Sequence, residues 1–347
     1  MEQERKEKIR DNEVWDRNNS DEEKENEVAE KQQAGEGEET ATQKPKIKYS
    51  VIGKDIIPDP KAESADFSGM RIGKIEGLGE MKNLKQISFR QNLIKVIEGL
   101  EACTELEELE LYDNKISKIE NTEHLKKLKV LDLSFNNIGK IENLDGHPEL
   151  ERLYILSNRI RKIENIPYFP KLQYIDFGSN KITEMENMET FQHVKDLCLA
   201  KNRLKEIKNL EKFTNLESLA LSANRITEIK GLDTLVNLRE LQLAENFLTK
   251  ITGLEKLVNL VTLDLSYNQI DSLTGLQNNV NLEEFWLNSN KVENYSDLEL
   301  LAANKKLNTL YLGGNPVSKI PGYRQKLLEL LPLLEQVDGT LVKPIGK

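Results

Sequence analysis

Leu131-Asp132-Leu133-Ser134-Phe135-Asn136 and Leu263-Asp264-Leu265-Ser266-Tyr267-Asn268 are two copies of one short pattern, from which the fold can be predicted. In each copy two leucines flank one polar residue, and an asparagine closes the segment three residues after the second leucine. The asparagine recurs every 22 residues, at positions 92, 114, 136, 158, 180, 202, 224, 246, 268 and 290. So regular a period predicts a stack of similar structural units.

The flanking sequence extends this pattern in both directions. Apolar residues follow each asparagine at two and five positions, as Ile116 and Ile119 do. A degenerate first copy has Met70 in place of the asparagine, and a last copy places Asn315 after a gap of 25 residues. This is the leucine-rich-repeat pattern, with a strand and a short helical turn in each unit. We therefore predict an α/β solenoid, a horseshoe of about twelve 22-residue repeats with a parallel concave sheet.

Composition divides the chain into three regions. Residues 1–43 hold 15 acidic and 7 basic residues and little that is apolar, so we expect residues 1–60 to form a disordered acidic tail and linker. Residues 61–302 carry the repeats, and residues 303–347 the last repeat and a cap whose leucines have helical spacing before Pro332. The N-terminal end of the stack is closed either by the variant first repeat or by part of residues 47–60.

Charge and motifs exclude several classes of function. The net charge of -10 argues against a nucleic-acid binder and gives no attraction to anionic membranes, and no apolar run is long enough to span one. Two cysteines cannot form a disulfide framework, which favours an intracellular protein. The histidines, His124, His147 and His193, have no metal-ligand spacing, and no catalytic constellation or cofactor motif is present. We expect a non-enzymatic binding protein without a cofactor.

The residue between the two strand leucines should face the open concave side, where partners of such solenoids dock. This position is rich in acidic and aromatic residues, and large exposed aromatics are typical interface anchors. With one neighbouring carboxylate on the same strand, the predicted partner-binding residues are Asp132, Tyr154, Asp176, Cys198, Asp264, Glu284, Trp286 and Tyr311. For Cys198, the residues alone favour a small, half-buried hydrophobe. The partner should be a folded protein with a basic, partly apolar patch.

Several segments give a more specific resemblance, which is collinear from about residue 65 to residue 340. They are Arg71-Ile72-Gly73-Lys74-Ile75-Glu76-Gly77, Arg90-Gln91-Asn92-Leu93-Ile94-Lys95, Leu131–Asn136 and Glu284-Phe285-Trp286. In these segments the chain resembles the leucine-rich-repeat regulators of protein phosphatase 1. The resemblance implies that the concave face binds the catalytic subunit of that phosphatase, sometimes with a second inhibitory subunit, in the nucleus and cytoplasm.

The resemblance also implies which residues make contact. Those that match the family are Asp132, Asp264, Glu284, Trp286 and Tyr311. Tyr154 and Cys198 stand where the family has Phe, and Asp176 where it has Glu, so the contact at Cys198 departs most from the family. Two alternatives stay open: a scaffold of a centrosomal, axonemal or spliceosomal assembly, and, more remotely, an enzyme with a site in the tail or with a metal that the sequence does not reveal.

Overall fold

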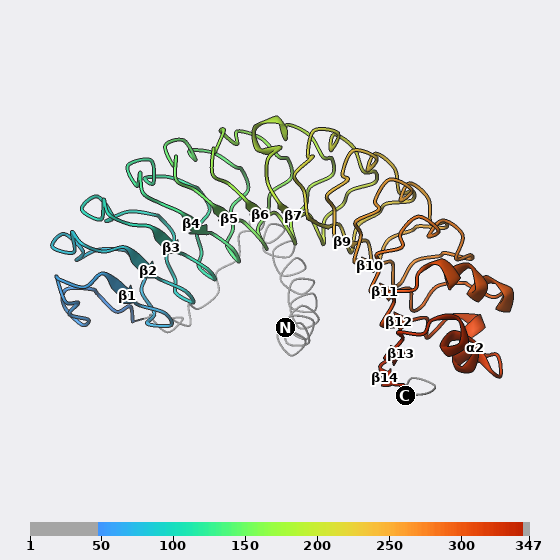
Figure 1. Cartoon of the computed structure of the whole chain (residues 1–347). Coiled ribbons are helices and arrows are strands. Elements are labelled where there is room, and N and C mark those ends of the chain that lie inside the picture. The colour runs from blue at the N-terminus through green and yellow to red at the C-terminus, as the bar shows by residue number, and fades with distance from the viewer. Residues whose placement is uncertain (1–47, 343–347) are drawn as a thin grey trace, which may run out of the picture. The chain divides into compact units, whose positions relative to one another are not determined.

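The computed structural model describes residues 48–342. From Tyr49 onward the chain forms a curved solenoid whose strands line the inner side of the arc (Figure 1). Twelve strands run parallel in chain order: β1 Ser64–Asp66, β2 Gln86–Ser88, β3 Glu108–Glu110, β4 Val130–Asp132, β5 Arg152–Tyr154, β6 Tyr174–Asp176, β7 Asp196–Cys198, β8 Ser218–Ala220, β9 Glu240–Gln242, β10 Thr262–Asp264, β11 Glu284–Trp286 and β12 Thr309–Tyr311. The predicted solenoid is confirmed, since the twelve successive strands are separated by eleven turns of the chain.

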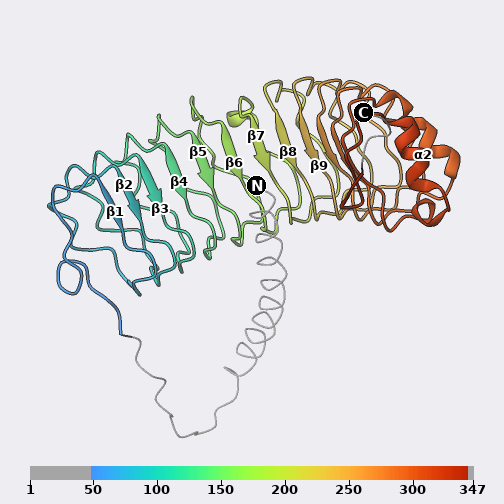
Figure 2. The same ribbon diagram turned by 60° about the horizontal axis from the view of Figure 1, so that its bottom comes forward.

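The strands follow one register along the sheet. Each pairs with the strand one repeat later (Figure 2). The register places Leu131 beside Leu153 and Asp132 beside Tyr154. The middle residue of each strand from β2 to β12 is buried, whereas the first and third residues face the concave side. Between β11 and β12 the repeat lengthens, because the 3₁₀ helix η2, Tyr295–Ala303, fills the convex side there.

The predicted asparagine ladder is present in every repeat from Asn92 to Asn290. Asn136 is typical: its Oδ1 accepts from the N–H of Ile116 at 2.9 Å, and its Nδ2 donates to the carbonyls of Leu111 and Leu133 at 2.9 and 3.1 Å. Asn315 repeats the arrangement in the last unit, with Val292 as donor. The side-chain amide thus satisfies buried backbone groups of two successive repeats, as the structural interpretation requires.

The convex side carries less helix than the sequence predicts. Apart from η2, the described residues contain only two short 3₁₀ helices, η1 Glu189–Phe191 and η3 Pro316–Lys319, and the other repeats cross this side as turns. Each such turn has a residue with positive φ, which is glycine at the ends of the array and asparagine at positions 121, 143, 165, 187 and 209. A 22-residue unit leaves no room for a longer helix.

The two ends of the stack are closed by different devices. At the C-terminus, helix α2, Tyr323–Leu330, buries Leu327 against the last repeat, and strands β13 Gln336–Val337 and β14 Thr340–Leu341 extend the sheet. Asp338 accepts hydrogen bonds from the backbone N–H groups of Leu312 and Gly313 at 2.8 and 2.7 Å, so it satisfies amides at the end of β12.

At the N-terminus the structure decides between the two predicted closures. Part of the expected linker, residues 50–56, folds onto the first repeat: Ser50 bridges to Ile72, and Ile52 is only 2% exposed. Ordered structure therefore starts before residue 61, because Ile52 covers core residues that the first repeat would otherwise expose. The expected acidic tail, residues 1–43, lies outside the described residues.

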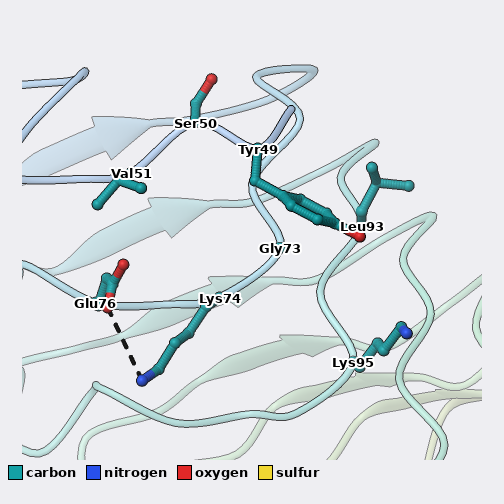
Figure 3. A pocket seen from close by; sticks show the side chains of 8 residues that line it. All are labelled: Tyr49, Ser50, Val51, Gly73, Lys74, Glu76, Leu93 and Lys95. Atoms are coloured by element: carbon teal, nitrogen blue, oxygen red, sulfur yellow. Dashed lines mark ion pairs between the residues drawn. The ribbon is translucent and has the colours of Figure 1, made fainter. Parts of the chain in front are cut away.

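The seam between this N-terminal cap and the repeats holds a shallow pocket of about 340 Å³ (Figure 3). The Tyr49 ring lies over Gly73, where an added Cβ would come within 2.5 Å of it, so the absence of a side chain at Gly73 makes room for the ring. Lys74 and Glu76 pair across 3.9 Å at the rim. The lining offers no cluster of groups for chemistry, and we assign the pocket to packing of the cap.

Candidate partner-binding face

One row of side chains crosses the concave sheet and contains most of the predicted binding residues. We define the concave row as the third residue of each strand from β4 to β12. Strand register places these residues side by side, in the order Asp132, Tyr154, Asp176, Cys198, Ala220, Gln242, Asp264, Trp286 and Tyr311. Glu284 is the first residue of β11 and faces the same side as Trp286.

The C-terminal end of the concave row is aromatic. The rings of Trp286 and Tyr311 meet edge to face, with centroids 6.4 Å apart and planes at 66°. The Tyr311 hydroxyl accepts a hydrogen bond from Gln336 Nε2 at 2.8 Å, so β13 fixes this ring from the other side. Both rings are half-buried, which leaves part of each exposed beside the Glu284 carboxylate. This arrangement suits a partner that offers an apolar group next to a cation.

A second aromatic pair lies toward the N-terminal half of the sheet. The Tyr154 and Tyr174 rings are tilted against each other at 4.9 Å. Tyr174 is the first residue of its strand and was not among the predicted contacts, although its place beside the concave row follows from the same period. Its hydroxyl donates to Asp176 Oδ2 at 3.3 Å, and burial raises the pKa of the Tyr174 phenol. The phenol therefore stays protonated and able to donate.

The three aspartates of the concave row hydrogen-bond to the backbone, a structural role that their sequence pattern was not taken to predict. Asp132 Oδ1 accepts from the N–H of Ser134 at 2.9 Å, and Asp264 Oδ1 from the N–H of Ser266 at 3.0 Å. Asp176 accepts likewise from Gly178 at 2.7 Å. Each carboxylate thus satisfies the amide that follows the strand. The Asp-x-Ser or Asp-x-Gly spacing was the available signal.

These aspartates differ in how accessible they are. Asp176 is only 8% exposed, and both of its carboxylate oxygens accept hydrogen bonds from Tyr174 and Gly178. Of the three aspartates it is therefore the least accessible to a partner. Burial raises the pKa of Asp132 above its ordinary value, although hydrogen bonds from Ser134 act in the opposite direction. Asp132 and Asp264 are half-buried and keep part of their carboxylate toward the concave side.

Between the two aromatic pairs, strands β7 and β8 place small side chains in the concave row, whereas β9 and β10 place Gln242 and Asp264 there. Cys198 is half-buried, as the sequence suggested, and the next strand presents Ala220 beside it. The residues two positions further on, Ala200, Ser222 and Ala244, are also small. A partner can therefore approach the backbone more closely here than over the aromatic pairs at β5–β6 and β11–β12.

The histidines are used for structure. His147 is 1% exposed and occupies a core position, where its ring nitrogens lie 3.2 Å from the Leu125 carbonyl and 3.3 Å from Thr122 Oγ1. Burial lowers the pKa of His147, so the ring is neutral near pH 7. His124 and His193 each contact one backbone carbonyl of the preceding repeat. Within residues 48–342 no three His, Cys, Asp or Glu side chains are grouped as metal ligands would be.

The other cysteine is part of the core. Cys103 is fully buried, and burial together with Glu101 raises the pKa of its thiol to about 11. A thiol that stays protonated near pH 7 is a poor nucleophile. No helix among residues 48–342 has both the length and the apolar character that crossing a membrane requires.

Comparison with known proteins agrees with this geometry at the level of the fold. A family model described as "Leucine Rich repeats (2 copies)" matches residues 82–126, 104–146, 192–234 and 236–278. The chain is a leucine-rich-repeat protein. An internalin of Listeria monocytogenes, InlF, superposes with a TM-score of 0.64 at 23% identity, covering 80% of this chain and 86% of that one. The functional domain of InlJ from the same organism superposes with a TM-score of 0.63 at 19% identity, covering 79% of this chain and 62% of that one. These likenesses show the solenoid alone.

Sequence comparison gives a shorter but more specific match. Protein phosphatase 1 regulatory subunit 7 of Homo sapiens is 42% identical over 50 residues, and that of Xenopus tropicalis is 44% identical over 50. The matched stretch covers 14% of this chain and 14% of each relative. No catalytic family is among the matches, and the solenoid is of a kind that typically binds proteins. The chain is thus a leucine-rich-repeat scaffold for protein binding with partial similarity to a phosphatase regulator.

Proposed function

We propose that this protein is a non-catalytic regulatory subunit that binds the catalytic subunit of protein phosphatase 1 through its concave row and controls its activity or the maturation of its holoenzymes. The observation that carries the proposal is the group formed by Glu284, Trp286 and Tyr311 on two adjacent strands. The local identity to regulatory subunit 7 supports the same assignment.

The physical basis is a surface with two anchors. Trp286 with Tyr311 at one end, and Tyr154 with Tyr174 at the other, provide apolar contact area that is already ordered by ring–ring packing. Carboxylates lie beside both pairs, so the partner should present basic side chains next to apolar ones. A folded catalytic subunit can span both anchors, because β7 and β8 between them place only the small side chains of Cys198 and Ala220 in the concave row. We propose that the complex forms in the nucleus and cytoplasm, with or without a second inhibitory subunit.

Direct binding tests this proposal. The full chain is immobilised through a terminal tag, and association of purified phosphatase 1 catalytic subunit is followed by biolayer interferometry. We expect saturable binding with a dissociation constant below about 1 μM, which corresponds to about 8 kcal/mol. Phosphatase 2A catalytic subunit serves as the specificity control. Equal affinity for both phosphatases, or binding to neither, would contradict the assignment and favour a scaffold for other proteins.

A further inference from the structure

The edge of the sheet where the strands end carries a regular row of basic residues. They occupy the position directly after the ladder asparagine in five of six consecutive repeats, Asn137 being the exception, and we call them the basic row: Lys115, Arg159, Lys181, Arg203 and Arg225. The backbone of this row is held by its own hydrogen bonds. The N–H of Arg159 donates to Ile138 at 2.9 Å, and that of Arg203 donates to Ile182 at 2.8 Å. The cations therefore start from fixed points that advance by about 5 Å per repeat.

The surroundings of the basic row are strongly positive although the chain is acidic. The six loops at residues 113–118, 135–140, 157–162, 179–184, 201–206 and 223–228 hold eleven basic and four acidic residues, a net of +7, against -10 for the whole chain. The net charge of the whole chain does not reveal that basic residues are concentrated in these loops. A field of one sign on one edge attracts a partner of the opposite sign.

The three arginines of the basic row have no carboxylate partner among residues 48–342. Arg159, Arg203 and Arg225 are exposed, and none forms an ion pair with another described residue. The nearby carboxylates of Glu184 and Glu206 are already paired with Lys208 at 2.9 and 3.3 Å. These three guanidinium groups are therefore available to an anionic ligand.

The row continues into an apolar residue. In the repeat after Arg225 the same position is Phe247, which is 50% exposed. Tyr267, 58% exposed, lies on this edge in the next repeat. These exposed aromatic rings can hold an apolar side chain of a ligand at the end of the basic row.

We propose that the basic row binds an extended acidic segment of a partner protein, with an apolar side chain of that segment seated against Phe247. In the C-terminal half of the row, carboxylates follow four residues after each ladder asparagine, at Glu184, Glu206 and Glu228, whereas the same position is lysine in the three preceding repeats. A peptide can turn its acidic side chains to the arginines and its neutral backbone to these carboxylates. A nucleic-acid strand is charged at every residue and would be repelled where Glu184, Glu206 and Glu228 stand close to the arginines in sequence.

This surface is separate from the concave row. Its residues follow the strands in sequence, so a catalytic subunit on the concave face leaves the basic row free for a second protein or for an acidic segment of the same partner. The inference goes beyond the proposed function and does not depend on it.

Fluorescence anisotropy on the full chain tests the proposal. The probe is a short labelled peptide in which Glu and Ser alternate and the last residue is Phe, and a peptide with Gln in place of Glu gives the non-specific baseline. The test variant is Arg159→Gln/Arg203→Gln/Arg225→Gln, because a single exposed ion pair contributes little by itself. The control variant, Lys82→Gln/Lys212→Gln/Lys256→Gln, removes the same charge from exposed sites away from the row.

The acidic peptide should bind the wild type at low salt, and the arginine variant should weaken it at least ~10-fold while the lysine control stays within about twofold. Phe247→Ala should weaken binding of this peptide but not of one that lacks the terminal Phe. Equal losses in both triple variants, or equal binding of the Glu and Gln peptides, would overturn the proposal. So would tighter binding of a labelled oligouridylate that is lost in the arginine variant, since that result would assign the row to RNA.

Discussion

Asn180 holds the backbone of the repeat before it: the N–H of Ile160 donates to Asn180 Oδ1 at 3.0 Å. The Nδ2 group of the same side chain donates to the carbonyls of Ile155 and Phe177, each at 3.0 Å. One amide thus ties two turns of the solenoid together at a site that is 7% exposed. The repeats are therefore coupled by polar contacts in addition to their leucines.

Replacing Asn180 with Leu should destabilise the protein although the change adds apolar surface. The buried N–H of Ile160 loses its partner, at a cost of about 1–3 kcal/mol, and the carbonyls of Ile155 and Phe177 each lose one of their two side-chain donors. Urea unfolding followed by circular dichroism measures the effect as a shift of the midpoint to lower urea. Asn137→Leu is the matched control, because Asn137 is half-buried beside the ladder and its side chain has no hydrogen-bond partner among the described residues. An unchanged midpoint for Asn180→Leu would refute the coupling.

Gly99 offers a second test of how successive repeats touch. Its φ is +70°, and an added Cβ would lie 2.3 Å from the Ile75 carbonyl oxygen of the previous repeat. In the next repeat the same position is Asn121, also at positive φ, whose Nδ2 donates to Ile97 at 2.7 Å. Gly99→Ala should therefore lower the free energy of unfolding by about 1–3 kcal/mol, because it adds strain without a compensating bond.

Gly99→Asn should cost less than Gly99→Ala, because its amide can donate to the carbonyl that the new side chain crowds. Gly79→Ala is the control, since nothing lies within 4 Å of an added Cβ there. The urea midpoints of the three variants rank their stabilities. If the Asn variant is no more stable than the Ala variant, the hydrogen bond does not explain the asparagines at this position.

His147 should make stability depend on pH. Its pKa is lowered by burial in the folded state, so the unfolded chain binds the proton more readily. Stability is then fully present above the ordinary histidine pKa of about 6.5 and is lost as the pH falls below it. His147→Leu, which matches Leu125 one repeat earlier, should remove most of the loss in melting temperature between pH 7.5 and pH 5.5. His124→Leu serves as the control and should leave that loss in place.

The sequence predicted the parts of the molecule that follow from period and burial. The spacing of Asn136 and its equivalents placed every strand from β2 to β11, because a fixed repeat length fixes the strand register. The leucines around Leu327 predicted the capping helix, since their spacing follows the helical turn. The concave row, with Trp286 next to Tyr311, followed from the alternation of each strand.

What could not be predicted depends on single side chains rather than on a period. Ile52 closes the N-terminal end, but it stands among Val51, Ile56 and Ile57 in a stretch that has no repeat period, so the sequence left two closures open. The backbone contacts of Asp132 and Asp264 depend on the conformation of the residue that follows each strand. The positive φ of Asn121 is likewise a local property that glycine and asparagine share. Whole-chain charge concealed the basic row, because it sums over faces that the fold separates.

The affinity of the Glu284→Ala/Trp286→Ala variant for phosphatase 1 catalytic subunit tests whether that subunit binds the concave row. A buried Trp anchor is typically worth ~2 kcal/mol or more, so binding should weaken at least ~30-fold. The control, Tyr168→Ala/Glu228→Ala, removes one exposed aromatic ring and one carboxylate from sites away from the concave row. It should bind within about twofold of wild type, and circular dichroism should show both variants folded. Wild-type affinity in the Glu284/Trp286 variant would contradict the account.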